Sequence, residues 1–410
     1  MAQADLARDA DRELAREREA LLAAVEAGAE QALALSRWMG ANPELSLEER
    51  ETSRRYVEWL RDGGFGVGTG AAGMETAFVA SRGSARAPFT AALLAEMDAL
   101  PEIGHACGHN LSGPASLLAA SALATVLPDD VLRLLVVGCP AEEIGVGKKR
   151  LVRGGAFEGV DVALMAHASD MRRAHRLFLG NRKLELIYHG KASHAAAYPE
   201  QGRNALDGVI SFFVAVGLLR QQLSRDARIH GIVSDGGQAP NVIPERAAAR
   251  VWVRALDTDL LAETTERVLA CARGAAELTG TELEVLEEAG GSPPMRANLP
   301  LAACYRRQLE HLGLPETAHA PQEAIGSSDI THVSHALPTI HPNFPICQRG
   351  RNLELHTRAF AEATGTPDGE AGLLEAARAL ALCVHELARC PAARAEVASA
   401  GSAPPPSGPE

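Results

Sequence analysis

The chain has 410 residues, of which 46% are hydrophobic and 22% are charged, and its formal net charge is −12 at pH 7. This length predicts two domains, each with a core of its own. The acidic balance argues against the basic face that binding to nucleic acid or to an anionic membrane requires, so we expect neither partner. No run approaches about 18 apolar residues, and the N-terminus has no apolar signal core. Because the seven cysteines show no paired spacing, we expect reduced thiols and a cytoplasmic protein.

The stretch 89–110 combines a buried strand with residue types that bind metals. Residues 89–95 are an almost uninterrupted apolar run, typical of a strand covered on both faces of a parallel sheet. In open α/β sheets, the loops at the carboxyl ends of the strands carry the chemistry. Cys107 and His109 lie in this loop, and Gly108 between them lets both side chains turn toward one centre. A buried thiol and a capping imidazole are the alternative interpretation.

Two further apolar strands end in polar residues at the same expected edge. The first, 131–138, is followed by the adjacent carboxylates Glu142 and Glu143. The second, 161–166, is followed by His167. Adjacent carboxylates are usually solvated, but a metal site needs both an anionic ligand and a base for its water. Three successive strands that end in such residues predict a metal-dependent active site.

The remaining pattern predicts the domain organisation. Residues 5–39 are expected to be helical, and Ser46 with Glu49 is expected to form a capping box before the next helix. Strands are expected at 183–190, 227–234, 246–256 and 282–286, and helices at 204–223 and 258–278. This order is the βαββαβ, or ferredoxin-like, unit. We therefore expect residues 1–182 and 296–398 to form one α/β domain with a mostly parallel sheet, 183–295 an inserted domain, and 399–410 a disordered tail.

The string AEMDALPEIGHACGHN, at 95–110, resembles the hallmark of the amidohydrolase branch of peptidase family M20. This branch includes aminoacylases, p-aminobenzoyl-glutamate hydrolases and dipeptidases that cleave β-alanyl-lysine-type dipeptides. The resemblance covers most of the chain outside its two ends. It implies a two-metal aminopeptidase-like catalytic domain, with the inserted ferredoxin-like domain acting as a lid and as the dimerisation surface.

The resemblance also implies roles for individual residues of the catalytic domain. Glu142 would be the general base, acting on a water held between two metal ions, and Asp98 would orient a ligand from behind. His341 is expected to form pocket wall or structure. The implied metal ligands are Cys107, His109, Glu143, His167 and His356.

Three residues of the inserted domain resemble substrate and transition-state contacts of the family. They are His194 in GKASHAAAYPEQGRNA, Asn241 in GGQAPNVIP, and Arg254. Without the resemblance, Asn241 is most simply a turn former and Arg254 a charge on a strand surface. We expect His194 to act in trans, completing the active site of the other subunit in a homodimer formed through the lid.

The sequence therefore predicts a metal-dependent hydrolase of amide bonds in N-acyl amino acids or dipeptides, with two divalent ions per subunit. Thiolate and imidazole ligands favour zinc, with manganese or cobalt as alternatives. Two other interpretations stay open. Cys107 could be the nucleophile of a cysteine hydrolase, or the chain could be a catalytically silent binding protein of the same fold. The sequence does not define the small-molecule substrate.

Overall fold

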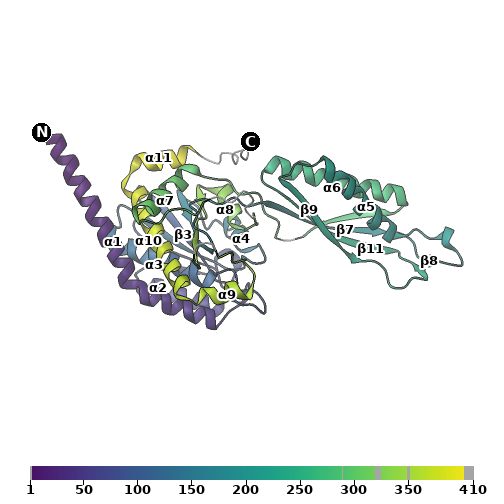
Figure 1. Cartoon of the computed structure of the whole chain (residues 1–410), viewed down its shortest axis with the longest axis horizontal. Helices are drawn as coiled ribbons and strands as arrows, with labels where there is room; N and C mark the ends of the chain where they lie inside the picture. Colours follow the sequence, from purple (N-terminus) through teal and green to yellow (C-terminus); the bar gives the residue numbers. More distant parts are fainter. Residues whose placement is uncertain (1, 289, 319–324, 349–350, 401–410) are drawn as a thin grey trace. The chain divides into compact units, whose positions relative to one another are not determined.

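The computed structural model describes residues 2–288, 290–318, 325–348 and 351–400, which divide into two compact units (Figure 1). The first unit contains residues 2–176, 296–318, 332–348 and 351–400. The second contains 177–288, 290–295 and 325–331, and is called the lid below. Residues 401–410 of the expected tail lie outside the described residues.

A six-stranded sheet forms the centre of the first unit. Its order is β1-β2-β4-β3-β5-β13. The bounds are β1 Gly66–Thr69, β2 Phe78–Arg82, β3 Thr90–Glu96, β4 Arg133–Cys139, β5 Val162–Leu164 and β13 Thr339–Ile340. Strands β4, β3, β5 and β13 are parallel, whereas β1 and β2 are antiparallel to their neighbours. Every residue of the central strand β3 is buried, which explains its apolar run. The expected mostly parallel sheet is confirmed.

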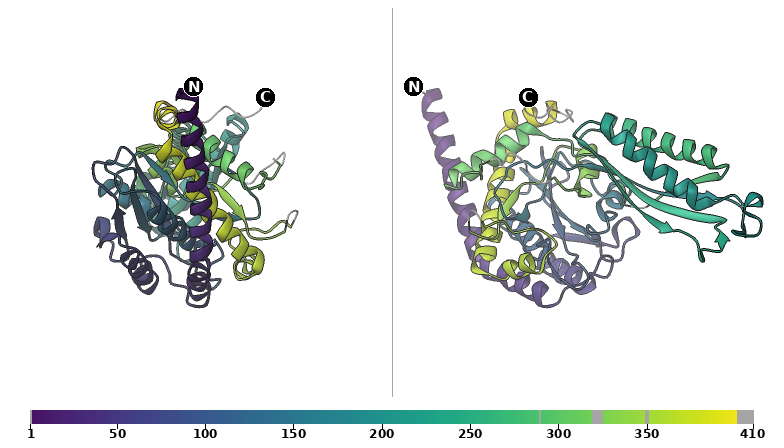
Figure 2. Two further views of the ribbon diagram at one scale, coloured as in Figure 1. Left: turned by 90° about the vertical axis from the view of Figure 1, so that its left-hand side faces the viewer. Right: turned by 45° about the vertical axis from the view of Figure 1, so that its right-hand side comes forward.

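Helices surround this sheet, and α1, α3 and α10 pack against one another (Figure 2). The expected N-terminal helix is a single helix of 40 residues. The helices are α1 Ala2–Ala41, α2 Arg50–Asp62, α3 His109–Val126, α4 Gly147–Arg153, α7 Leu299–His311, α8 Ile330–Ala336, α9 Arg358–Thr364, α10 Pro367–Arg389 and α11 Pro391–Ser399. A short parallel pair, β6 (His167–Ser169) with β14 (Asn343–Pro345), lies beyond the end of β5. Among the described residues, no helix is both long and apolar enough to cross a membrane.

The capping box expected before α2 is wrong. Glu49 is the residue before the helix, but its side chain makes no capping hydrogen bond. Its buried carboxylate instead accepts hydrogen bonds from the hydroxyl of Thr76 and from the N–H of Ala141, each at 2.9 Å. Ser46 donates its hydroxyl to Asp98 Oδ2 at 2.7 Å. Buried hydrogen bonds are stronger than solvent-exposed caps, so both side chains turn inward and brace the loops after β3 and β4.

The lid is a four-stranded antiparallel sheet with two helices on one face (Figures 1 and 2). In chain order its elements are β7 Gly180–His189, α5 Ala205–Leu219, β9 Ala227–Asp235, β11 Arg246–Ala255, α6 Thr258–Thr279 and β12 Glu282–Glu287. The sheet order is β12-β7-β11-β9. The expected ferredoxin-like unit is therefore confirmed. A two-stranded ribbon of β8 (Ser193–His194) and β10 (Val242–Ile243) follows β7, and 3₁₀ turns span Ala71–Gly73, Pro199–Gln201 and Arg220–Gln222.

Candidate metal centre

The loop after β3 and the start of β6 bring a thiol and two imidazoles together. Gly108 has a φ of 82°, and a Cβ at this position would lie 2.4 Å from the Cβ of Ala168. The close backbone approach expected for this glycine is thus confirmed. Cys107 Sγ lies 3.5 Å from His167 Nε2. With His109 these residues form a group whose donor atoms all lie within 4.8 Å of one another.

The backbone around His167 fixes which ring nitrogen is available. His167 begins β6, and its Nδ1 lies 2.8 Å from the carbonyl oxygen of Ala168. The proton therefore belongs on Nδ1, and the lone pair of Nε2 points toward Cys107. Burial lowers the pKa of His167 to about 4, so the ring is neutral near pH 7. A neutral imidazole with a defined acceptor nitrogen meets the requirement for a metal ligand.

A second group of donor atoms contains the same cysteine. Cys107, Glu143 and His356 offer three donor atoms that also lie within 4.8 Å of one another. His356 Nε2 lies 3.5 Å from Glu143 Oε2, and the N–H of His356 donates to the carbonyl of Ala106 at 2.9 Å. The φ of His356 is +62°. A residue other than glycine persists in this conformation only where its surroundings hold it, and such strain is concentrated at functional sites.

Two carboxylates flank these donor groups. Glu142 forms a third group with His109 and Glu143. The buried carboxylate of Asp98 accepts from Ser46 and from the N–H of Glu143 at 3.0 Å, and lies 3.2 Å from His109 Nδ1. Burial acts to raise the pKa of Asp98, but its contacts with His109 lower it overall. Asp98 is therefore an ionised group that holds the His109 ring from behind.

A buried ion pair between Lys148 and Glu96 lies next to His109, and neither residue was among the predicted site residues. Lys148 Nζ lies 2.6 Å from Glu96 Oε1, and both side chains are 0% exposed. Glu96 Oε2 lies 3.3 Å from His109 Nε2. Burial acts to lower the pKa of His109, but Glu96 and Asp98 raise it well above its ordinary value. A metal ion that binds this ring must displace a proton. The signal in the sequence was a glutamate at the end of an otherwise apolar strand.

The chemistry of the donor set fits divalent transition-metal ions, which bind thiolate, imidazole and carboxylate groups. Burial raises the pKa of Glu143 to about 7, and its Oε1 is buried without a hydrogen-bond partner among the described residues. Burial and the charge of Glu143 also raise the pKa of Cys107 well above its usual range. A bound cation would compensate both groups, because it stabilises their charged forms.

The candidate residues of the lid lie in two places. His194 is in β8, next to the start of β10, where the N–H of Ala195 donates to the carbonyl of Asn241 at 3.0 Å. His194 Nδ1 accepts hydrogen bonds from two backbone N–H groups, including that of Ala197 at 3.1 Å. This assigns the ring proton to Nε2. The structure thus brings His194 and Asn241 side by side on the exposed ribbon.

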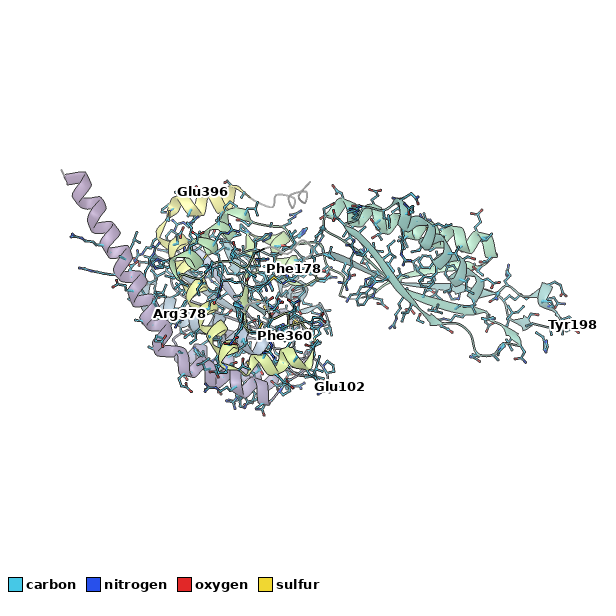
Figure 3. All side chains as sticks on the ribbon, in the orientation of Figure 1. Glu102, Phe178, Tyr198, Phe360, Arg378 and Glu396 are labelled. Atoms are coloured by element: carbon cyan, nitrogen blue, oxygen red, sulfur yellow. The ribbon has the colours of Figure 1, made fainter. Side chains whose placement is uncertain are left out.

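Arg254 lies at the other end of the lid sheet. It pairs with Asn181, eight residues along β7 from His189, where the strand leads toward the ribbon. Eight residues of strand span roughly 26 Å. Figure 3 labels Tyr198, in the turn that follows the ribbon strand β8, and Phe178 at the opposite end of the lid. One lid therefore presents its candidate residues at two ends.

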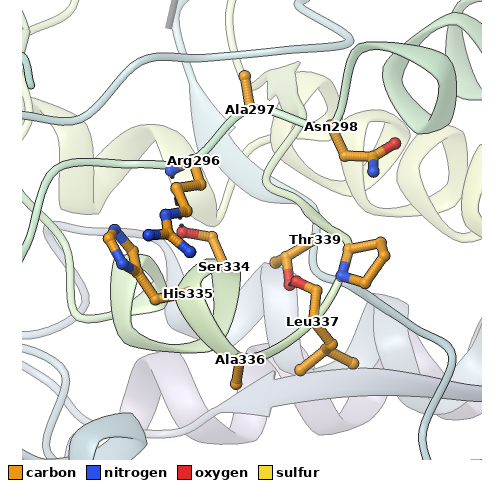
Figure 4. Close-up of a pocket in the computed structure, with 9 residues that line it drawn as sticks. Arg296, Ala297, Asn298, Ser334, His335, Ala336, Leu337 and Thr339 are labelled. Atoms are coloured by element: carbon orange, nitrogen blue, oxygen red, sulfur yellow. Dashed lines mark hydrogen bonds between the residues drawn. The ribbon is translucent and has the colours of Figure 1, made fainter. Parts of the chain in front are cut away.

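Figure 4 shows a pocket of about 140 Å³ in the first unit. Its lining includes Arg296, Ser334 and Thr339, at the start of β13. His341 follows the carboxyl end of the same strand, and its buried ring lies 5.1 Å from the ring of His167. The pocket contains none of the predicted site residues, whereas His341 packs against one of them.

The fold and the donor set define a class, that of α/β metallopeptidases with an inserted domain. Residues 179–278 match the family model described as a peptidase dimerisation domain. The chain is 35% identical to the Xaa-Arg dipeptidase of Mus musculus, over 90% of this chain and 88% of the relative. It is 32% identical to one of the p-aminobenzoyl-glutamate hydrolase chains of Escherichia coli, over 67% of this chain and 61% of the relative.

Solved structures agree with this fold. A dinuclear metal-binding peptidase of the M20 family from Bacillus subtilis superimposes with a TM-score of 0.70 at 20% identity, covering 88% of this chain and 99% of that protein. The chain therefore belongs to the M20 peptidase family, whose members hydrolyse amide and peptide bonds. The family resemblance found in the sequence is confirmed.

Proposed function

We propose that this chain hydrolyses the amide bond of dipeptides or N-acyl amino acids with the help of two divalent metal ions. The observation that carries the proposal is that two donor groups share Cys107, one with His109 and His167 and the other with Glu143 and His356. The Bacillus subtilis structure, described as dinuclear, supports two ions. The mixed thiolate and imidazole ligands favour zinc, with manganese or cobalt as alternatives.

The metal ions, when bound, would polarise the substrate carbonyl and make a water more acidic. Glu142 would take a proton from the attacking water and deliver it to the leaving amine. Its neighbour Glu143 would serve as a ligand, and Asp98 would hold His109 in one orientation.

The lid would supply the contacts to the substrate. His194, with its proton on Nε2, would donate a hydrogen bond to the oxyanion that forms as water attacks. Asn241 and Arg254 would bind the backbone or carboxylate of the substrate. These roles come from the family resemblance and are supported by the tautomer of His194.

A homodimer through the lid accounts for an exposed apolar surface. Ile210, Val214 and Leu218 form a stripe along α5 and are 51%, 60% and 72% exposed. Ile232, which is 63% exposed, lies on the edge strand β9. Exposed apolar stripes and unpaired strand edges favour association, and a second copy would cover both. In such a dimer, His194 would complete the active site of the partner.

The relatives leave the charge of the leaving residue open. The name of the mouse relative gives an arginine as the second residue of its substrate, whereas that of the Escherichia coli relative gives a glutamate. The cysteine-hydrolase alternative is disfavoured, because burial raises the pKa of Cys107 and keeps the thiol protonated when no metal is bound. The cytoplasmic location and the absence of nucleic-acid and membrane partners stay predictions.

Metal analysis combined with peptide hydrolysis tests the proposal. Protein reconstituted with zinc, manganese or cobalt is expected to hold two ions per chain and to hydrolyse dipeptides or N-acyl amino acids. Cys107→Ser is expected to lose both ions, His356→Ala one, and the control Cys271→Ser, in the lid, neither. Hydrolysis that survives complete removal of metal by a chelator but stops with iodoacetamide would show that the enzyme is a thiol hydrolase.

A further inference from the structure

A tight loop follows β4 and carries the adjacent glutamates Glu142 and Glu143. The N–H of Gly147, where the loop ends, donates to the carbonyl of Ala141 at 3.4 Å. A Cβ at Gly147 would lie only 1.7 Å from the carbonyl oxygen of Pro140, so the loop returns close to its own beginning. In so short a loop, the backbone dihedral angles of Ala141 set the direction of the two glutamates that come directly after it.

The backbone of Ala141 has a left-handed conformation. Its φ is +59°, and the residue is fully buried. This conformation brings the Cβ of an L-residue close to the carbonyl oxygen that follows, which is unfavourable for residues other than glycine. A strained residue keeps such a conformation only where its surroundings hold it. A contact with another part of the fold is therefore needed to hold Ala141.

The contact comes from a buried carboxylate that is distant in sequence. Glu49, the residue before α2, accepts the N–H of Ala141 on Oε1 at 2.9 Å. Its Oε2 accepts the hydroxyl of Thr76, which precedes β2, at 2.9 Å. The three residues are at most 1% exposed. A single side chain therefore connects the start of α2, the turn before β2 and the loop after β4.

A buried carboxylate at this position is costly for the fold. Glu49 forms no ion pair among the described residues. Burial, together with the nearby charge of Asp98, raises the pKa of Glu49. An apolar side chain would avoid the cost of desolvation, but it could not accept the two hydrogen bonds. The carboxylate therefore indicates that its hydrogen bond to Ala141 has a role beyond the stability of the core.

We infer that Glu49 is a positioning residue for the reaction. Its hydrogen bond holds Ala141 in the left-handed conformation, and this conformation aims Glu142 and Glu143 in the directions that a general base and a metal ligand need. Placement matters because an error of about 1 Å can cost about 10²-fold in rate. The inference rests on the proposed function, and it adds a residue that contacts neither the substrate nor the metal ions.

Substitutions of Glu49 test this role. For metal-loaded Glu49→Ala, kcat is expected to fall by about 10²-fold while KM stays close to that of the wild type, because the direction of Glu142 affects the chemical step. Glu49→Gln keeps an acceptor for the N–H of Ala141 and should stay within about threefold of the wild-type kcat. Glu48→Ala, at the exposed neighbouring glutamate, is the control and should match the wild type. No loss of kcat in Glu49→Ala, or an equal loss in Glu49→Gln, overturns the inference.

A second substitution tests whether Glu49 acts through the backbone of Ala141. Glycine adopts a φ of +59° without the clash of a side chain. Adding Ala141→Gly to Glu49→Ala should therefore restore kcat by about tenfold. A loss of activity that arises from general destabilisation would not be reversed by glycine, because glycine makes the unfolded chain more flexible. If Glu49→Ala does not fold, Glu49→Asp takes its place, because the shorter side chain cannot reach both partners. In either background, the absence of rescue overturns the inference.

Hydrogen exchange of the metal-free protein separates this inference from the hydrolase proposal. Mass spectrometry follows deuterium uptake by residues 140–147 and, as a reference, by β3. Uptake at 140–147 is expected to be about tenfold faster in Glu49→Ala than in the wild type, because the N–H of Ala141 loses its acceptor, while β3 is unchanged. Faster exchange of this loop in a protein that hydrolyses no peptide would reject the proposed function but support the hold of Glu49 on the loop. Unchanged exchange, or equal acceleration of both segments, overturns the inference.

Discussion

The candidate functional residues of the two units are held in different ways. In the first unit, Cys107, His109 and His167 are buried, and hydrogen bonds to backbone carbonyls hold the two imidazoles. In the lid, His194 and Asn241 are exposed on a two-stranded ribbon. A buried set is preorganised by the fold of one chain, whereas an exposed set acts in a dry site only after another surface covers it. Under the proposed function, the metal centre is therefore preorganised within one chain, whereas the lid residues act only with a partner.

The largest expected effect concerns the two adjacent glutamates of the metal centre. Glu142→Gln should lower kcat by about 10³-fold, because general-base catalysis contributes factors of this size. Its metal content should stay close to that of the wild type. Glu143→Gln should instead lower metal occupancy, measured by elemental analysis after dialysis. Equal loss of metal from both variants would contradict the separate roles of these neighbours.

A second test measures how much the buried Glu96–Lys148 pair contributes to the stability of the fold. Lys148→Met removes the ammonium partner of the buried Glu96 carboxylate and leaves only His109 beside it, which should lower the free energy of unfolding by about 3–5 kcal/mol. Lys149→Met removes a more exposed charge from the next position of α4 and should change it by less than about 0.5 kcal/mol. Urea unfolding of the metal-free proteins measures both. Similar values for the two variants would mean that the buried pair does not stabilise the fold.

Much of this centre could be predicted from the sequence, because apolar strands followed by Cys107, Glu143 and His167 mark one edge of a parallel sheet. His356 was placed by family resemblance alone, since it follows no strand, and its donor atom comes close to Glu143 only in three dimensions. The Glu96–Lys148 pair could not be predicted, because its members lie 52 residues apart and meet only after folding.

The prediction of a capping box was wrong for a related reason. The spacing of a capping box is a local signal. Ser46 and Glu49 instead form hydrogen bonds with Asp98 and Ala141, which are distant in sequence. The ferredoxin-like order of the lid was predictable because it depends on periodicity within single elements.

A charge placed in the apolar stripe of α5 tests whether the lid needs a partner subunit. Leu218→Glu places a charge in the proposed interface and should give monomers in size-exclusion chromatography. Without the partner's His194, activity should fall by about 10²-fold, the effect of losing one oxyanion donor. Leu278→Glu, at a leucine of α6 that is 76% exposed, should stay dimeric and active. A monomeric Leu218→Glu with full activity would contradict action in trans.

The mildest test mixes two inactive variants. In a mixed dimer of Glu142→Gln and His194→Ala, one site keeps Glu142 and receives His194 from the other chain, while the second site lacks both. With random exchange of chains half of the dimers are mixed, so about a quarter of wild-type activity should return. The activity of the mixture is compared with that of each variant alone. No recovery after demonstrated exchange would place His194 in its own chain's site or in a structural role.

The separation of His194 and Arg254 at opposite ends of one sheet has a consequence for substrate binding in the dimer. A sheet of packed strands moves as a body, so a rotation that shifts one end also shifts the other. If His194 serves the partner's site and Arg254 its own, each lid connects two active sites. Substrate that draws the lid toward one site then changes the affinity of the second. We therefore expect saturation curves that depart from a simple hyperbola, with a Hill coefficient that differs from one and is no greater than two, the number of sites.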